Sequence, residues 1–385
     1  MKIGPQTGKT TPPAIKLFWL LLLLYVFLVG ITLMSSTFKA MGEGQADALL
    51  SGLKSPFAGL AVGILATVLV QSSSLTTSIV VTAVAGNVLA LDVAVYTIMG
   101  CNIGTTITNT LVSLGHARQD AEFKRAFAGA TMHDFFNLIA IAVFMPLEMA
   151  TGFLRNLAGA VSHWLIAGEI SGGKFHSPIK ASFKFVAKPI QKFFLDDLGP
   201  WLGLPTWAAG TFAILVALAM LFVALVLITK LMRSLMAKNL EAGLNAILGK
   251  SGILAIFIGM AMTIAVQSSS ITTSLMVPLF AAGILTLENG FPVTLGANIG
   301  TTVTGLIAAL GVTTHQEAAL TIALVHFFFN LFSTILVYPI PAVRHVPIQI
   351  ARKLAELTSR SRSYAILYVV VVFILIPLIG ILITK

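Results

Sequence analysis

Long apolar stretches separated by short basic segments make up most of the chain. Seven are long enough to cross a membrane as helices, at residues 17–34, 93–114, 126–147, 207–229, 291–311, 318–340 and 364–384. Two more apolar stretches, the first at residues 57–91, are interrupted midway by a run of Ser and Thr. Each half of an interrupted stretch is too short to span alone. We therefore expect a broken helix or re-entrant hairpin, which is tolerated where its backbone lines a cavity inside the protein.

The two interruptions are copies of one sequence. Gln71, Ser72, Ser73 and Ser74 recur as Gln267, Ser268, Ser269 and Ser270. The pentapeptide Asn-Ile-Gly-Thr-Thr begins 31 residues after each Gln, and HDFFN in the first half matches HFFFN in the second after a slip of three residues. The chain therefore contains a duplicated unit of roughly 90 residues.

The duplicated polar runs lie in almost uncharged surroundings. Between residues 57 and 114 only Asp92 carries a formal charge, and between residues 251 and 311 only Glu288 does. In hydrocarbon, an unsatisfied hydroxyl or amide costs several kcal/mol, so these groups must pair with protein, water or a ligand. A single Ser-rich turn is also compatible with simple hydrogen bonding between helices. Two copies, each followed by a distant Asn-Ile-Gly-Thr-Thr, favour a polar site where the repeats meet.

Composition agrees with a membrane protein. Hydrophobic residues make up 57% of the 385 positions, charged residues only 10%, and the mean hydropathy is +0.95. Soluble domains carry about a quarter charged residues. The net charge of +10 lies in short loops, which indicates contact with lipid headgroups of the bilayer rather than with nucleic acid. The single Cys101 excludes an internal disulfide and a Cys-based metal cluster.

The distribution of Lys and Arg predicts the topology. With a cytoplasmic N-terminus and both interrupted stretches as hairpins, residues 115–125, 230–250 and 341–363 lie inside, and residues 312–317, which lack Lys and Arg, lie outside. The C-terminus is then extracytoplasmic, and the hairpins enter from opposite sides as an inverted-topology repeat. A Lys-rich segment at 174–192 is expected as a helix on the membrane surface, although this topology places it outside.

The expected fold is an all-α integral membrane protein of the cell membrane, with two inverted-topology repeats that each contain a hairpin, plus amphipathic surface helices. Six segments follow from the pattern. They are a tail, first helix and loop (1–56), repeat 1 (57–147), interfacial helices with a short extracellular loop (148–206), a transmembrane helix and basic linker (207–250), repeat 2 (251–340), and a basic loop with the last helix (341–385).

Four features of the sequence resemble the type II sodium–phosphate cotransporters: the doubled QSSS, the paired NIGTT, EFKRAFAGATMHDFFN at 122–137, and HFFFN followed by YPIP at 338–341. The resemblance runs from about Gly59 to Leu378, and the doubled QSSS is that family's signature. The chain lacks the large disulfide-bearing extracellular loop, the last span and the Cys-rich tail of the animal members. The resemblance implies a minimal bacterial symporter that couples inward sodium movement to uptake of inorganic phosphate.

The duplicated turns suit a phosphate site. Hydrogen phosphate is a dianion with several acceptor oxygens, and hydroxyls, amides and free backbone N–H groups offer donors without a full positive charge. The expected phosphate-binding residues are Gln71, Ser72, Ser73, Ser74 and Asn102 in repeat 1, and Gln267, Ser268, Ser269, Ser270 and Asn298 in repeat 2.

Hydroxyl and amide oxygens are also ligands for sodium, which is expected as a co-substrate with no further cofactor. The carboxylate of Asp134 lies inside a span, and its repeat counterpart is Phe327; such a carboxylate is a functional candidate. In the resembling family an Asp in this motif marks electrogenic members, so electrogenic transport is expected. His133 and His326 are expected to make structural hydrogen bonds. The expected sodium-binding residues are Asp134, Thr105, Thr106, Thr301, Thr302, Thr304, Gln71 and Gln267.

Other functional classes fit less well. An enzyme is not expected, because no motif links a Ser nucleophile to a base and an orienting carboxylate. A channel would require a continuous polar pore, whereas broken-helix inverted repeats favour alternating access. Transport of another oxyanion, such as arsenate or sulfate, remains an alternative. The sequence leaves open whether the chain forms a homo-oligomer.

Overall fold

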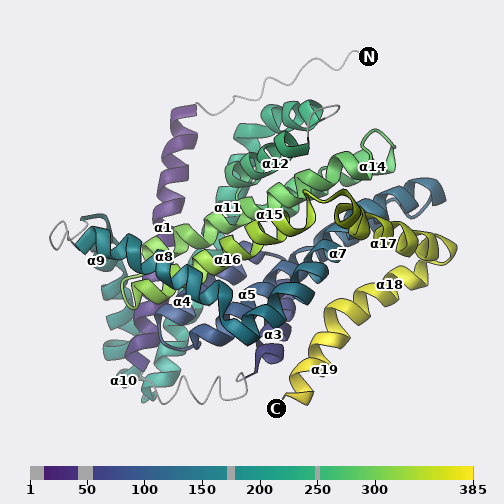
Figure 1. Ribbon diagram of the computed structural model, residues 1–385. Coiled ribbons are helices and arrows are strands. Elements are labelled where there is room, and N and C mark those ends of the chain that lie inside the picture. Colours follow the sequence, from purple (N-terminus) through teal and green to yellow (C-terminus); the bar gives the residue numbers. More distant parts are fainter. Residues whose placement is uncertain (1–12, 42–54, 171–177, 248–251, 385) are drawn as a thin grey trace.

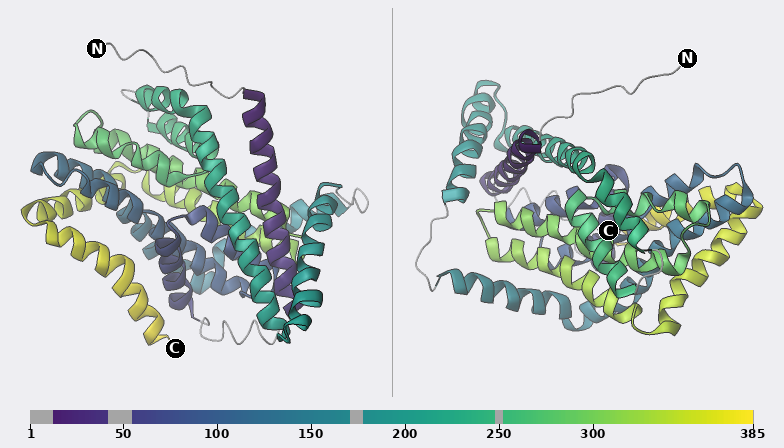
Figure 2. Two further views of the ribbon diagram at one scale, coloured as in Figure 1. Left: turned by 180° about the vertical axis from the view of Figure 1, so that it is seen from behind. Right: turned by 90° about the horizontal axis from the view of Figure 1, so that it is seen from above.

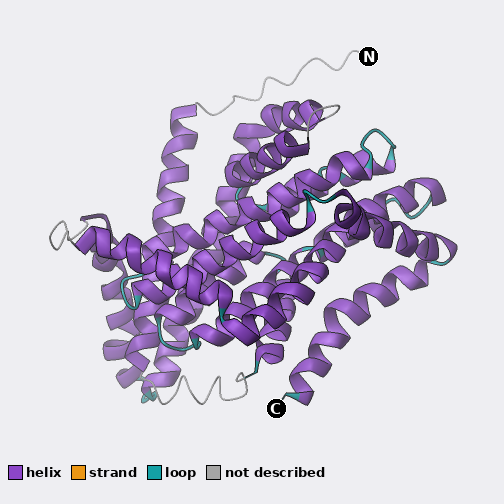
Figure 3. Cartoon of the chain, viewed as in Figure 1, coloured by secondary structure: helices purple, strands orange, loops and turns teal. Residues whose placement is uncertain are grey.

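The computed structural model describes residues 13–41, 55–170, 178–247 and 252–384, and the regular elements in these ranges are all helices (Figures 1 and 3). Six helices among these residues are long and apolar enough to cross a membrane. They are Ala14–Met41, Asp120–Thr151, Thr206–Met232, Leu287–Gly311, Gln316–Val337 and Arg362–Ile383. The expectation of an all-α, multi-pass membrane protein is therefore confirmed.

One of the seven expected crossings, at residues 93–114, is not a continuous helix. It is divided into α5 (Leu91–Thr105) and α6 (Ile107–Leu114), with the break at Thr106. Two other helices are longer than their apolar cores: α1 spans Pro13–Met41, and α11 spans Thr206–Ile247 and so continues through most of the segment expected as a linker. Hydropathy locates the part of a helix that lies in lipid, and helices extend beyond it where their ends remain hydrogen-bonded.

The helices differ in how deeply the protein buries them. In the most apolar window of α7 (Asp120–Thr151) and of α15 (Leu287–Gly311), 72% and 78% of residues are buried. The corresponding shares are 39% for α1, 33% for α11 and 11% for the last helix, Arg362–Ile383, which comprises α18, η2 and α19. Figure 2 shows α1 and α11 side by side at one edge of the bundle. Of the expected site residues, the deeply buried α7 carries Asp134, and α15 carries Asn298 and three threonines.

The two interrupted stretches form similar helices, and they differ where the second contains Pro278. In the first half, α3 (Pro56–Val70) is followed by α4 (Ser73–Ala85). In the second half, α12 (Gly252–Val266) is followed by α13 (Ser269–Ser274) and α14 (Val277–Ala281). Pro278 has no N–H to donate to the carbonyl one turn back, so the helix is interrupted just before it. The residue at the equivalent position of α4 is Thr82, and α4 continues.

Glycines bring the helices of each half into backbone contact. In the first half, a Cβ on Gly63 of α3 would overlap the carbonyl oxygen of Thr97 in α5. In the second half, a Cβ on Gly296 of α15 would overlap the carbonyl oxygen of Ile256 in α12. Such close approach of backbones is a common way for helices to associate in membranes, where apolar burial gives little driving force.

The halves also pack against each other. Helix α4 contacts α15 and α16 (Gln316–Val337), and α14 contacts α7. The largest apolar core joins α1, α4, α5 and α16, and it includes Ile31, Val81, Ile98 and Phe329, all fully buried. The two halves are thus not separate bodies, because each contributes helices to the packing of the other.

The Lys-rich segment expected on the membrane surface is a helix, α9 (Pro178–Lys192), followed by η1 (Phe193–Leu198) and α10 (Gly199–Trp201). Its apolar flank packs against α1: Phe183 is 3% exposed, and the Tyr25 hydroxyl donates to the Ser182 carbonyl at 3.0 Å. Lys184 and Lys188 are exposed on the other side. The expected helix is confirmed from Pro178 onward, and residues 174–177 of the prediction lie outside the described part of the chain. Protein rather than lipid covers part of its apolar face.

Replacing Gly296 by Ala tests the close packing. The added methyl group overlaps the backbone of α12, and overpacking of this kind costs about 1–3 kcal/mol. We expect the apparent melting temperature of the purified protein in detergent to fall by several degrees. The control is Gly159→Ala in α8 (Phe153–Ile170), where a Cβ meets no atom within 4 Å. Equal melting temperatures for both variants would contradict the interpretation.

Candidate functional site

Both Gln-Ser turns have the same backbone conformation. Gln71 has φ 56° and Gln267 has φ 57°, in the left-handed region that non-glycine residues seldom adopt. The backbone N–H of each Gln donates to a Thr carbonyl four residues earlier, at 2.8 and 2.7 Å. Each Gln side chain also donates from Nε2 to the carbonyl three residues back, at 2.6 and 2.7 Å. The Gln therefore satisfies carbonyls at the end of its own helix.

A new helix begins directly after each Gln. The side chain of Ser72 accepts the N–H of Leu75 at 3.3 Å, and the side chain of Ser268 accepts the N–H of Ile271 at 3.4 Å. These serines are N-caps with extended backbone, as is typical of the first position before a helix. The serines that follow lie in the first turn, where backbone N–H groups have no intrahelical acceptor.

The two turns differ in exposure. Gln71 is exposed and Ser72 is half-buried, whereas Gln267 and Ser268 are both half-buried. Ser73, Ser74 and Ser269 are buried, and Ser270 is half-buried. Serine hydroxyls and first-turn N–H groups are thus present at both turns, at the boundary between exposed and buried space.

A threonine in the same half binds each Gln. The Thr108 hydroxyl donates to Oε1 of Gln71 at 3.0 Å, and the Thr304 hydroxyl donates to Oε1 of Gln267 at 2.9 Å. Thr304 was expected from the sequence, whereas Thr108 was not. The repeat itself contains the missing signal, because Thr108 occupies in the first half the position of Thr304 in the second.

Asn109, the neighbour of Thr108 on α6, connects the two halves. Its Oδ1 accepts the hydroxyl of Thr273 at 3.0 Å and the hydroxyl of Ser274 at 2.9 Å, both on α13. The repeat counterpart of Asn109 is Gly305, which lies against the methyl group of Thr77. One short helix, α6, therefore contacts the Gln turn of the first half and the Ser-rich helix of the second.

A second group of buried polar residues joins the halves. Nε2 of His133 lies 2.7 Å from Oδ1 of Asn298, and Nδ2 of Asn298 donates to Oδ1 of Asn137 at 2.9 Å. Asn137 donates in turn to the backbone carbonyl of Asn102 at 2.9 Å. These four residues are at most 4% exposed. Asn298 of the second half is thus held by α7 of the first, while the Asn102 side chain donates within its own helix, to Ile98 at 3.0 Å.

Asp134 is 1% exposed and has a partner outside the repeats. The hydroxyl of Tyr368 in α18 (Arg362–Val370) donates to its Oδ2 at 2.7 Å. The neighbouring polar residues of α7, His133 and Asn137, hydrogen-bond elsewhere. Thr106, at the break between α5 and α6, is a close neighbour of the carboxylate. Tyr368 was not expected, because 234 positions separate it from Asp134.

Four of the other expected sodium ligands lie at the end of α5 and on α15, and their hydroxyls donate to carbonyls of their own helices. The hydroxyls of Thr105 and Thr106 donate to Cys101 and Ile103, both at 2.8 Å. Those of Thr301 and Thr302 donate to Ala297 and Ile299, at 3.0 and 2.7 Å. A hydroxyl that donates to a carbonyl keeps lone pairs with which it can coordinate a cation.

Several buried polar atoms near these groups have no hydrogen-bond partner among the described residues. They are Oδ1 of Asp134, Nδ1 of His133, Nδ1 of His326, Oδ1 of Asn330 and Oγ1 of Thr77. Buried polar groups are normally paired, so a concentration of such atoms is typical of a place that holds water or an ion. Four of the five lie on α7 and α16, the helices that carry the HDFFN and HFFFN motifs.

Comparison with known proteins gives one family. The chain matches the family described as Na+/Pi-cotransporter over residues 26–170 and 211–337. It is 34% identical over 92% of its length to sodium-dependent phosphate transport protein 2A of Ovis aries, and 35% identical over 94% of its length to protein 2B of Bos taurus. It spans 65% and 64% of those two proteins, just under two thirds. No solved structure matches the chain.

Asn109→Ala tests the connection between the halves. The substitution removes the acceptor of the Ser274 hydroxyl, whereas the Thr273 hydroxyl keeps the Ser269 carbonyl at 2.8 Å. Loss of a partner by a group inside the protein costs about 1–3 kcal/mol. We expect a lower apparent melting temperature in detergent. Ser113→Ala is the control, because the buried Ser113 hydroxyl donates only within α6, to the Thr110 carbonyl at 2.6 Å. A loss no larger than that of the control would show that the contact between halves is not stabilising.

Proposed function

The chain belongs to the Na+/Pi-cotransporter family, and on this premise we propose that it is a symporter coupling inward sodium movement to uptake of hydrogen phosphate across the cell membrane. The observation that carries the proposal is the shared contact of both Ser-rich elements with α6. Thr108 holds Gln71 of one turn, and the adjacent Asn109 holds Thr273 and Ser274, which follow the other. Donor groups from two distant parts of the sequence are thereby directed toward one region.

We place phosphate at these turns. Its binding residues are the turn residues 71–74 and 267–270, where hydroxyls and first-turn N–H groups donate to an oxyanion. Neutral donors suit a site that must release its ligand, because they bind less strongly than a bidentate arginine. Asn102 and Asn298 remain proposed phosphate ligands, because each amide uses one hydrogen within the protein and has a second to donate.

We place one sodium ion at Asp134. Its unpaired Oδ1 supplies a charged oxygen, and Thr106 beside it supplies a hydroxyl oxygen. The hydroxyl of Tyr368 orients the carboxylate through Oδ2. A bound cation offsets the cost of a carboxylate at this depth, and without a counter-charge that cost is high. The remaining expected ligands, Thr105 and the threonines of α15, are assigned to further sodium positions by their free lone pairs.

Contacts between segments support the proposed topology. The ion pairs Lys124–Glu356 (2.9 Å) and Asp120–Arg362 (2.5 Å) join residues 115–125 to residues 341–363, both of which we place in the cytoplasm. On the side that we place outside the cell, the Ser162 hydroxyl donates to the Glu317 carbonyl at 3.0 Å. This hydrogen bond joins α8 to residues 312–317. Figure 1 shows α3 and α12 toward opposite ends of the bundle, as inverted repeats require.

Uptake of labelled phosphate into proteoliposomes tests the function. We expect accumulation with an inward sodium gradient and only background uptake with a potassium gradient. Arsenate and sulfate, added as competitors, distinguish phosphate transport from transport of another oxyanion. In the same assay Ser269→Leu should reduce uptake to background, since it removes a donor and fills the site with an apolar side chain. Ser359→Leu, on a helix outside the site, should transport normally. Near-normal uptake by Ser269→Leu would rule out the proposed phosphate position.

Asp134→Gly tests the charge carried by the cycle. In the proposed cycle, the carboxylate of Asp134 binds one sodium ion more than a site of neutral oxygens would. The cycle then moves net positive charge inward. Moving one elementary charge across the membrane changes its energy by about 2.3 kcal/mol per 100 mV of potential. A negative-inside potential set with potassium and valinomycin should therefore accelerate uptake by the unaltered protein. The variant should keep sodium-dependent uptake and lose its response to the potential. A full voltage response in the variant would contradict the assignment.

A further inference from the structure

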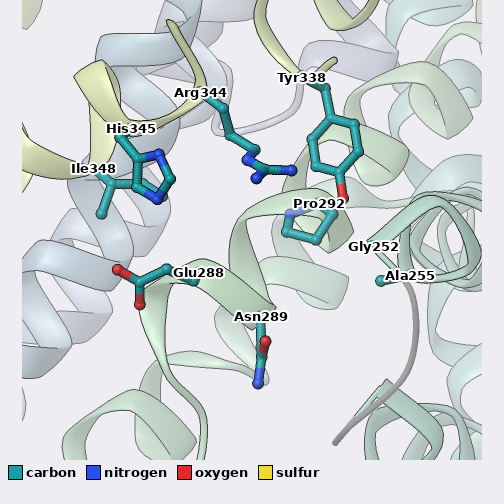
Figure 4. Close-up of a pocket in the computed structure, with 9 residues that line it drawn as sticks. All are labelled: Gly252, Ala255, Glu288, Asn289, Pro292, Tyr338, Arg344, His345 and Ile348. Carbon is teal, nitrogen blue, oxygen red and sulfur yellow. The ribbon is translucent and has the colours of Figure 1, made fainter. Parts of the chain in front are cut away.

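A cavity of about 210 Å³ lies apart from the Gln turns, where the first turns of three helices meet (Figure 4). The helices are α12, α15 and α17 (Pro341–Arg360). Polar side chains at its wall come from Glu288, Asn289, Tyr338, Arg344 and His345. Nothing in the proposed transport cycle uses these residues.

The cavity has an unmatched positive charge. Figure 4 shows Arg344 reaching into the space between His345 and Tyr338, with its guanidinium 5.1 Å from the centre of the Tyr338 ring. None of the ion pairs among the described residues includes Arg344. The one carboxylate at the cavity, Glu288, is already paired with Arg352 at 2.6 Å. An added anion is therefore attracted by Arg344 without a competing free carboxylate.

The position of Arg344 in its helix increases this positive potential. It lies in the first turn of α17, where the helix dipole is itself positive and a cation is unfavourable. That turn contains no acidic residue, and its N-cap, Ile340, offers no side-chain hydrogen bond. Ser, Thr, Asp or Asn would be usual at such a position. The helix end thus lacks the negative group that would normally neutralise it.

The duplication provides an internal comparison. A cavity of about 400 Å³ occupies the equivalent place in the first half and is lined by Asp92, Glu148, Thr151, Gly152 and Arg155, among others. With the slip of three residues, Thr151 and Gly152 stand where the second half has Arg344 and His345, and Glu148 stands where it has Pro341. The first-half cavity contains two carboxylates and the guanidinium of Arg155. In the second-half cavity the one carboxylate is already paired with Arg352, and the guanidinium of Arg344 has no ion pair. The basic character is thus specific to one end of the protein.

An exposed apolar surface adjoins the basic cavity. Ile253 and Phe257 on α12 are 63% and 57% exposed, and Ile340 before α17 is 52% exposed. Residues at helix ends with this exposure face acyl chains in a membrane protein. We propose that the cavity binds the phosphate of an anionic phospholipid headgroup, whose acyl chains lie along this surface. The chemistry is that of a phosphate ester, held by a guanidinium and a phenol hydroxyl.

Titration of the purified protein in a neutral detergent with phosphatidylglycerol, followed by native mass spectrometry, tests the proposal. We expect Arg344→Gln to weaken binding of one phosphatidylglycerol about tenfold, as loss of a charge-assisted hydrogen bond implies. Tyr338→Phe removes a single hydroxyl with little risk to the fold and should weaken the same binding less. Lys353→Gln is the matched control, because it removes one positive charge from the same helix outside the cavity.

Two further measurements distinguish a lipid headgroup from free inorganic phosphate as the ligand of this cavity. Phosphatidylcholine should not bind with any dependence on Arg344, and millimolar inorganic phosphate should not displace phosphatidylglycerol. Displacement by inorganic phosphate, or binding equal in Arg344→Gln and Lys353→Gln, would overturn the proposal. The measurement needs no ion gradient, so its outcome is independent of whether the protein transports phosphate.

Discussion

The constraint on which this structure depends is that a polypeptide broken inside a membrane protein must satisfy its polar groups without bulk water. Gln71 and Gln267 meet it at two places, because each ends one helix with its own side chain while a serine caps the next. A Gln can do this because its amide donates to a carbonyl and accepts a hydroxyl at the same time. The turns are thus stable without a charged residue, which leaves their remaining donors free for a ligand.

The duplicated halves are not equal where they meet. Asn109 hydrogen-bonds to the other half, whereas its counterpart Gly305 has no side chain with which to do so. Asp134 accepts a hydrogen bond from Tyr368, whereas its counterpart Phe327 has no polar group. Duplication explains the scaffold of turns and glycine contacts, since both halves require the same backbone. The unequal positions carry charge or a connection between halves. In the function that we propose, these are the features that set ion stoichiometry and coupling.

The sequence predicts the scaffold better than the contacts within it. Apolar length and the repeat indicate the helices and the two turns because both depend on local pattern. The break at Thr106 was missed, since apolar residues continue on either side of it. The Tyr368–Asp134 bond was missed because nothing in the pattern of a lipid-facing last helix marks which of its residues contacts the centre. Asn109 was missed because its role depends on where α13 of the other half lies.

The short helix α6 gives the two halves a common mechanical element. Thr108 and Asn109 are consecutive, so their side chains leave the helix about 100° apart and contact different partners. Thr108 hydrogen-bonds to the turn of its own half, and Asn109 hydrogen-bonds to α13. A rigid movement of α6 cannot preserve both sets of hydrogen bonds unless both halves move with it. In the proposed transport cycle one part of the protein moves against another around the site. The hydrogen bonds of Thr108 or those of Asn109 must then break and re-form. The break at Thr106, directly before α6 and beside Asp134, puts the carboxylate next to the point where this helix is joined to the rest of its half.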